Sequence, residues 1–177
     1  IRSDITTKKL LKEHESLAEA AENSKLCDFR VGVATLGVQS PELFKETINF
    51  AKEGNFGIHI HLQEIREEVT AIRNNLGFTP IQYCAQSGLF DFPTIAAHCV
   101  WIDSEDTKIL ADHSVGVAHN PMSNMILASG VCPVPELRGM GVNVGIGIDG
   151  AGSNDSQNML ESLKITPLLQ RVKHLQA

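Results

Sequence analysis

The chain has 177 residues, of which 42% are apolar and 20% are charged, and this balance fits one globular domain with a real core. Its formal net charge of −6 argues against nucleic acid and anionic membrane surfaces as partners. No apolar run approaches the ~20 residues that a transmembrane helix needs, so we expect no membrane association.

Helical and strand-like segments alternate along the whole chain. The helical segments contain strong helix formers, and the strand-like segments are rich in Val, Ile and Ala. In chain order we expect a helix at 3–24, a strand at 29–37, a helix at 40–55, a strand at 56–62, a helix at 64–77, a strand at 94–102, a helix at 103–114, a strand at 115–119, a loop at 120–133, a short helix at 134–141, a strand at 142–149 and a helix at 156–175.

Several of these helices have recognisable ends. Ser3 or Thr6 is suited to cap the first helix, and Ser40 is suited to cap the second. Gly54 is a typical stop for the second helix. Pro167 predicts a kink or a break in the last helix, because proline lacks the N–H that an interior turn requires.

Each of the five expected strands is followed by a helical segment or loop, and no tight hairpin turn connects two strands. Strands without polar alternation are typical of a sheet that is buried on both faces. The pattern therefore predicts an α/β fold with a parallel sheet, either doubly wound or a barrel. Composition alone does not decide between these two.

The four cysteines show no C-x-x-C spacing and form no disulfide framework. Cys84 and Cys99 lie among small and apolar residues, which predicts buried free thiols. Free thiols favour a cytoplasmic location.

Ionisable and amide side chains stand near the exits of the expected strands. They are His61 and Glu64 after the second strand, His98 on the third, His119 and Asn120 at the end of the fourth, and Asp149 at the end of the fifth. Active sites of parallel α/β proteins form at these strand ends. Several ionisable groups in one apolar place are costly unless they bind one another or a metal, and imidazole with carboxylate suits Zn or Fe. His59 alone gives no such signal and is interpreted as a structural neighbour.

The segments "IHIHLQE", "TIAAHCVWI" and "VAHNPMSNMILASGVCPVPELRGMGVNVGIGIDGAGSN" carry an ordered series of motifs: H-x-x-E, A-H-C, H-N-P-x-S-N and D-G-x-x-S-N. This series closely resembles the amidohydrolase superfamily. Within it, the chain is most similar to the branch that holds guanine, cytosine, adenosylhomocysteine and methylthioadenosine deaminases and the triazine hydrolases. The resemblance runs from about residue 31 to the C-terminus.

The resemblance implies a (β/α)8 TIM-type barrel with a mononuclear metal site, most readily Zn, with Fe as the alternative. Carried over by motif, His61 would be a metal ligand, and Glu64 would protonate a ring nitrogen of the substrate. His98 would hold or polarise the attacking water, and Asp149 would touch the metal and accept the proton of that water. The remaining motif residues, expected at the substrate pocket, are Asn120, Ser123 and His119.

Two departures from the family limit these expectations. The family takes two further metal ligands from an H-x-H on its first strand, and no candidate precedes His61. We therefore expect residues 1–177 to be an incomplete barrel domain, with about strands 4 to 8 and without the N-terminal strands and the family's β-sandwich. A substrate-contacting histidine of many deaminases is replaced by residues 35–37, Thr-Leu-Gly, which argues against the nucleoside deaminases.

Three functions remain open from the sequence. The first is a deaminase acting on a small N-heterocycle such as a purine, pyrimidine, pterin or triazine. The second keeps the site but hydrolyses a cyclic amide or carbamate. The third is a catalytically incompetent barrel fragment, since two sound ligands do not close a tetrahedral metal site. A homo-oligomer is consistent with the family and with the open sheet edges.

Overall fold

Five parallel strands form one sheet in the computed structural model, which describes residues 7–175. Neighbouring strands pair strictly in chain order, β1-β2-β3-β4-β5. The strands are β1 (Arg30–Val33), β2 (Gly57–Leu62), β3 (Thr94–His98), β4 (Gly116–His119) and β5 (Val144–Ile146). The prediction of a five-stranded parallel sheet is confirmed.

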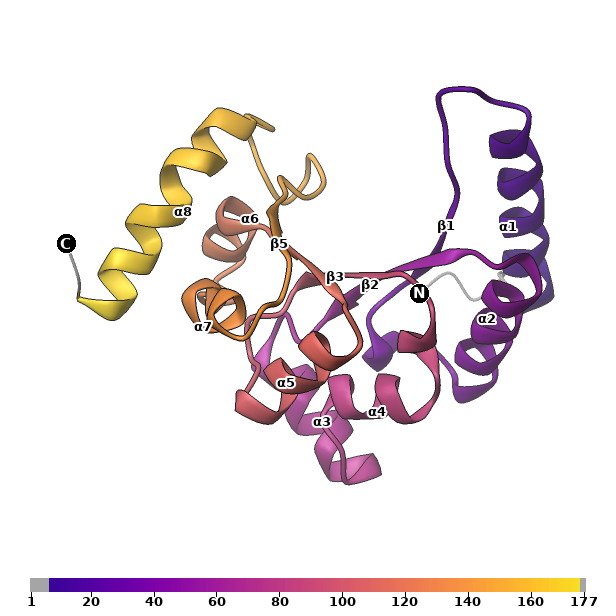
Figure 1. The fold of residues 1–177 in the computed structure, drawn as a ribbon, viewed down its shortest axis with the longest axis horizontal. Helices are drawn as coiled ribbons and strands as arrows, with labels where there is room; N and C mark the ends of the chain where they lie inside the picture. Colours follow the sequence, from indigo (N-terminus) through magenta and orange to yellow (C-terminus); the bar gives the residue numbers. More distant parts are fainter. Residues whose placement is uncertain (1–6, 176–177) are drawn as a thin grey trace.

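The helices follow the sheet in the same order. Figure 1 shows α1 and α2 beside β1 at one end of the molecule, and α7 and α8 beyond β5 at the other. The helices are α1 (Thr7–Glu22), α2 (Pro41–Gly54), α3 (Arg66–Leu76), α4 (Pro80–Gln86), α5 (Ser104–Asp112), α6 (Pro121–Ile126), α7 (Val134–Gly139) and α8 (Met159–His174), with short 3-10 turns η1 (Leu36–Val38) and η2 (Leu89–Asp91).

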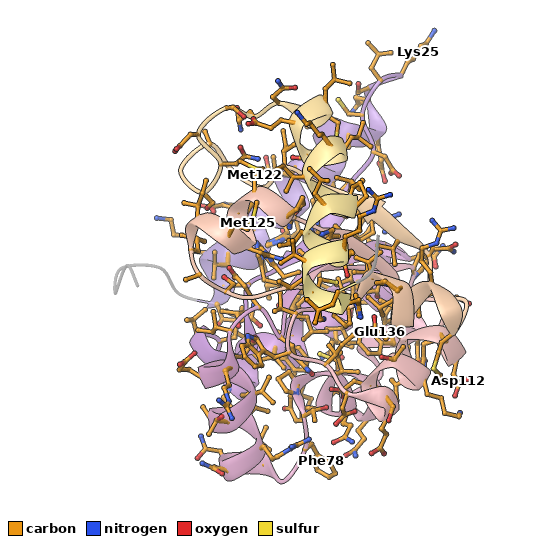
Figure 2. All side chains as sticks on the ribbon, turned by 90° about the vertical axis from the view of Figure 1, so that its left-hand side faces the viewer. Lys25, Phe78, Asp112, Met122, Met125 and Glu136 are labelled. Atoms are coloured by element: carbon orange, nitrogen blue, oxygen red, sulfur yellow. The ribbon has the colours of Figure 1, made fainter. Side chains whose placement is uncertain are left out.

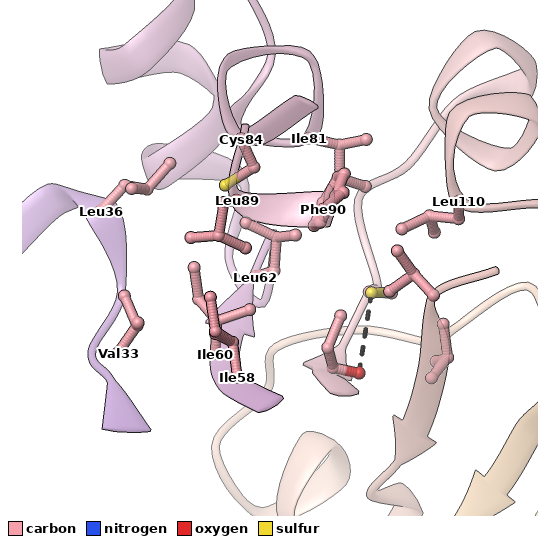
Figure 3. Close-up of a cluster of buried hydrophobic side chains, with 14 of the residues drawn as sticks. Val33, Leu36, Ile58, Ile60, Leu62, Ile81, Cys84, Leu89, Phe90 and Leu110 are labelled. Carbon is pink, nitrogen blue, oxygen red and sulfur yellow. Dashed lines mark hydrogen bonds between the residues drawn. The ribbon is translucent and has the colours of Figure 1, made fainter. Parts of the chain in front are cut away.

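The core lies between one face of the sheet and the helices that cover it. Ile58, Ile60 and Leu62 alternate along β2 and are completely buried. Figure 3 shows them in one apolar cluster with Leu89 and Phe90 from η2. Burying such side chains contributes roughly 1.5–3 kcal/mol each, so this face is the main source of stability.

The opposite face of the sheet differs from the sequence prediction. His59 and His61 alternate with the core residues of β2, and both are exposed. The expectation that the strands are buried on both faces is therefore wrong for β2, and β1 shows the same one-sided pattern. The reason is that the helices within residues 7–175 pack against one face, and the histidines point away from it.

Three helix predictions need correction. Gly54 is the last residue of α2, and the turn that ends the helix is made by Asn55, whose φ is 51°. The segment predicted as a loop at 120–133 contains α6, because the proline of its H-N-P motif occupies a first-turn position where no N–H is needed. Pro167 lies inside a continuous α8, so the predicted break is wrong, and the alternative, a kink, stays a prediction.

Other predictions are confirmed or lie beyond the described part. Ser40 caps α2 by accepting the N–H of Leu43. The candidate caps Ser3 and Thr6 lie outside the described residues. The cysteines that the structure describes are free, with Cys27 exposed and the other three buried. Among residues 7–175, no helix combines the length and apolar character needed to cross a membrane.

The last helix packs along the side of the molecule next to α6. Figure 2 shows α8 on this side, with Met122 and Met125 of α6 labelled beside it. Gln170 and Lys173 of α8 donate hydrogen bonds to the carbonyls of Cys132 and Val131. These bonds tie α8 to the segment between α6 and α7, which leads to the candidate site.

Candidate functional site

Three strand exits carry residues in the left-handed backbone conformation although none of them is glycine. Gln63 follows β2 with φ 51°, His98 ends β3 with φ 73°, and Asp149 follows β5 with φ 63°. Such conformations cost roughly 1–3 kcal/mol each and persist only where the surroundings enforce them. Their occurrence at the ends of β2, β3 and β5, on one edge of the sheet, marks this edge as the candidate functional site.

His98 lies at the centre of this edge and is 1% exposed. Its Nδ1 lies 2.8 Å from Oδ1 of Asn124, an acceptor, so Nδ1 donates its proton to this oxygen. Nε2 is buried without a hydrogen-bond partner and lies 3.7 Å from Oε2 of Glu64 and 3.9 Å from Oδ2 of Asp149. Two carboxylates and one free imidazole nitrogen thus converge on one point.

The three histidines of β2 and β3 form a row. The ring centroids of His59 and His61 are 6.3 Å apart, and those of His61 and His98 are 5.5 Å apart. Loss of solvation and the nearby His61 and Arg30 lower the pKa of His59. A neutral imidazole is the form that binds metals, and the lowered pKa favours this form of His59.

Asp149 is held by two hydrogen bonds. Ser123 Oγ donates to Oδ2 over 2.5 Å, and the N–H of Gly150 donates to Oδ1 over 2.6 Å. Burial alone would raise the pKa of Asp149, but these bonds and the histidines His98 and His61 outweigh it and lower the pKa. Asp149 is therefore an anion at neutral pH.

One short stretch of chain, residues 123–129, contacts all three converging side chains. Ser123 bonds Asp149, and Asn124 bonds His98. At the far end of the stretch, Ser129 Oγ donates to Oε1 of Glu64 over 3.0 Å. The stretch starts within α6, and it fixes groups from β2, β3 and the end of β5 relative to one another.

The predicted residues Asn120 and His119 are buried beside this cluster, but no hydrogen bond within the described residues joins them to Glu64, His98 or Asp149. Asn120 packs against β5, where a Cβ at position 147 would lie 2.2 Å from its Oδ1. Both ring nitrogens of His119 lack partners, and burial lowers its pKa to about 4.

The donor types at this edge fit a divalent transition metal, since imidazole and carboxylate are typical zinc ligands. The unpartnered Nε2 of His98 is the kind of buried polar atom that such an ion or a bound water satisfies. Among residues 7–175, however, no three His, Cys, Asp or Glu side chains gather closely enough to hold a metal ion by themselves. The cluster thus offers part of a coordination shell.

Sequence reasoning brought together Glu64, His98 and Asp149 but overlooked two contacting residues. Asn124 stands in the H-N-P-x-S-N motif, and its position there was the available signal. Ser129 lies within the segment predicted as a loop at 120–133, and nothing in its local pattern indicates that it reaches Glu64, which is 65 positions away.

The fold and the cluster together define an α/β protein of the barrel type with a polar centre at the carboxyl ends of its strands. The chain belongs to the amidohydrolase family, whose sequence model matches residues 3–177.

Curated relatives match the chain closely over a part of their length. A 5-methylthioadenosine/S-adenosylhomocysteine deaminase of Desulforudis audaxviator is 48% identical over 75% of this chain and 31% of the relative. A 5'-deoxyadenosine deaminase of Methanopyrus kandleri is 40% identical over 93% of this chain and 40% of the relative. The chain therefore spans less than half the length of these relatives.

Solved structures share the fold. A zinc-bound adenosine deaminase from Xanthomonas campestris superimposes with a TM-score of 0.90 at 24% identity, covering 96% of this chain and 39% of that one. A guanine deaminase from C. acetobutylicum gives a TM-score of 0.89 at 20% identity, covering 96% and 41%. The predicted likeness to part of an amidohydrolase barrel is confirmed by these superpositions.

Proposed function

We propose that the chain supplies the catalytic edge of a metal-dependent aminohydrolase that removes ammonia from a purine nucleoside. One observation carries the proposal: the carboxylates of Glu64 and Asp149 converge on the open Nε2 of buried His98. Hydrolytic deamination needs one group that gives a proton to the ring, one that takes a proton from water, and one that orients the water. The cluster provides a side chain for each.

The reaction exchanges an amino group for oxygen. Water adds to the ring carbon that bears the amine, so a C–O bond forms, and Glu64 gives its proton to the adjacent ring nitrogen. Asp149 takes one proton from the water and passes it to the amine, the C–N bond breaks, and ammonia leaves. The remaining hydroxyl proton passes to Glu64 as the carbonyl forms, which restores the acid form of Glu64. His98 directs its Nε2 lone pair at the water, because Asn124 holds the ring proton on Nδ1.

His61 and Asp149 would contribute ligands to the metal, with further ligands from outside the described residues. A divalent ion there, most readily zinc, would make water acidic enough to serve as a nucleophile near pH ~7. The low pKa of Asp149 supports this role, since only the ionised carboxylate binds a cation.

The nucleoside assignment rests on the curated relatives, which are named as 5-methylthioadenosine/S-adenosylhomocysteine deaminase and 5'-deoxyadenosine deaminase. The absence of a histidine at positions 35–37 argued for a different heterocycle. The Thr35 hydroxyl donates a hydrogen bond to the buried Glu68. The side chain of Thr35 is therefore bonded within the protein, just after β1, and does not face a ligand. We therefore favour the substrate class of the relatives.

Metal content and ammonia release together test the proposal. Elemental analysis of the protein and of its His61→Ala and Asp149→Ala variants should show about one zinc per chain, lost in both variants. His113→Ala and Asp112→Ala are matched controls, because both residues are exposed and lie at the C-terminal end of α5, outside the cluster.

Ammonia release should then be measured with adenosines that carry an uncharged 5' group, and with guanine and an aminotriazine for comparison. Glu64→Gln should lower the rate with the best substrate by ~100-fold or more, as expected for a lost general acid. A protein that holds zinc but hydrolyses a cyclic amide instead would contradict the deaminase assignment, and a protein without metal in any form would contradict the metal site.

A further inference from the structure

Glu64 stands in the three-residue connection between β2 and α3, where regular structure does not fix its side chain. Its two carboxylate oxygens face different partners. Oε2 lies 3.7 Å from Nε2 of His98, and Oε1 accepts the hydroxyl of Ser129 over 3.0 Å. A carboxylate held at one oxygen presents the other in a defined direction.

Ser129 is itself firmly held, and it is 3% exposed. Its N–H donates to the carbonyl of Asn124 over 2.8 Å, and its own carbonyl accepts the indole N–H of Trp101 over 2.7 Å. The next residue, Gly130, has φ 123° and packs so tightly that a Cβ would lie 2.8 Å from Val100. The backbone around the hydroxyl therefore has little freedom.

Trp101 closes this arrangement back onto the segment that carries Glu64. The N–H of Trp101 donates to the carbonyl of Gln63 over 3.0 Å. The guanidinium of Arg66 stacks 5.6 Å above its indole ring. Gln63 thus contacts the backbone of Trp101, and Arg66 contacts the indole that orients Ser129.

We propose that Ser129 is a positioning residue for Glu64, and that Trp101 sets the place of Ser129. This inference rests on the proposed deaminase function, in which Glu64 delivers a proton to the substrate. The Ser129 hydroxyl bonds Oε1 of Glu64, so the proton of Glu64 stays on Oε2, the oxygen on the His98 side. The substrate therefore receives the proton from Oε2. Without the hydroxyl, the carboxyl group can rotate, and the delivering oxygen is no longer fixed.

The catalytic test uses a pair of variants of equal shape. Ser129→Thr keeps the hydroxyl, and Ser129→Val replaces it by a methyl group of similar size. We expect Ser129→Val to lower kcat by ~10- to 100-fold relative to Ser129→Thr, the loss typical of a hydrogen bond to a charged group, with KM nearly unchanged. In the Glu64→Gln background, the same pair should differ little. The proposal would be overturned if Ser129→Thr and Ser129→Val had equal kcat values. It would also be overturned if their kcat values differed as much with Glu64→Gln as without it.

A second test does not depend on activity. Trp101 is the single tryptophan of the chain, so its fluorescence reports unfolding in urea. If Ser129 holds Glu64, the urea midpoint of the Ser129→Ala/Glu64→Ala double variant falls by less than the sum of the two single shifts. Additive shifts would overturn the contact and with it the positioning role. If the parent protein releases no ammonia, the proposed function fails, and this unfolding cycle still decides whether Ser129 holds Glu64.

Discussion

The imidazole of His119 is an unusual group to find at the end of a parallel strand. It is 0% exposed, and neither ring nitrogen has a hydrogen-bond partner among the described residues. Burial is the main cause that lowers its pKa from 6.5 to about 4, and the nearby His98 and Lys173 act in the same direction. The folded protein therefore holds this ring neutral at pH values where the unfolded chain protonates it.

His119 should make stability depend on pH in a defined window. The unfolded state binds more protons than the folded state between pH 6.5 and about 4, so stability is complete above this window and falls as the pH drops through it. The fall of the His119 pKa from 6.5 to about 4 corresponds to a loss of about 3 kcal/mol in the free energy of unfolding. His119→Leu should flatten this part of the profile, as measured by urea unfolding at pH 7, 6, 5 and 4. Parallel profiles for both proteins would contradict the assignment.

Gly145 and Gly147, in and just after β5, differ in the space around them and form a matched pair of variants. A Cβ at Gly147 would lie 2.2 Å from Oδ1 of buried Asn120, whereas a Cβ at Gly145 meets nothing within 4 Å. Gly147→Ala should therefore displace Asn120 and destabilise the protein by about 1–3 kcal/mol. Gly145→Ala should change stability by about 0.5 kcal/mol or less, because it exposes a methyl group without a clash.

Thermal unfolding and substrate kinetics check this pair. If Asn120 shapes the substrate pocket, Gly147→Ala raises KM, and Gly145→Ala does not. An alanine at 147 that leaves both Tm and KM unchanged would exclude Asn120 from that role.

At the scale of elements, a buried polar network joins β2 to α4 and α5. Gln63 accepts the N–H of Ile81 and donates to Asp106 over 3.0 Å, and Thr79 donates to the other oxygen of Asp106 over 2.5 Å. Gln63 also donates to the carbonyl of Trp101 over 2.6 Å. The strained backbone at the β2 exit is thus held by side-chain bonds from two helices and the β3 exit.

Removing the centre of this network should be costly. Asp106→Ala leaves one N–H of the Gln63 amide and the buried hydroxyl of Thr79 unpaired, so we expect a loss of about 2–4 kcal/mol in the free energy of unfolding. Asp112→Ala, at an exposed pair with Lys108, should change it by about 0.5 kcal/mol or less. Urea unfolding of both variants measures the difference, and equal midpoints would show that the network contributes nothing.

The strands and most helices were predictable because their signals are local. Runs of Val and Ile mark the strands, and Ser40 before a proline marks the start of α2. α6 was not predicted, because the H-N-P sequence indicates a loop when its proline is considered alone. The one-sided burial of β2 was also missed, since which face the helices cover depends on packing between distant segments rather than on the alternation of one strand.

The site was predictable as far as its motifs extend along the chain. Glu64, His98 and Asp149 follow strands, and parallel strands bring their ends to one edge. The contact of Ser129 with Glu64 was not predictable, because it depends on the path of the chain after α6 and on the indole of Trp101. A side chain such as Ser129, which orients another side chain, does not stand in a recognisable sequence motif.

At the scale of the whole molecule, the described sheet is open. β1 pairs with β2 alone and β5 with β4 alone, so both outer edges lack a strand partner within residues 7–175. Apolar side chains of α8 face solvent, with Leu160 74% and Val172 73% exposed. Unpaired strand edges and exposed apolar surface both favour association.

We therefore expect the 177-residue chain to self-associate as its concentration rises, because association would cover the strand edges and the exposed side of α8. Light scattering coupled to size-exclusion chromatography, over a hundredfold range of concentration, measures the average mass. Leu160→Glu combined with Val172→Glu should lower that mass at a given concentration and leave the urea midpoint nearly unchanged, since both positions are solvated. The matched control is Lys164→Glu, which adds charge to the same helix without removing apolar surface. A monomer at every concentration would show that the open edges are too short to pair, and a mass that falls equally in the control would assign the effect to net charge instead.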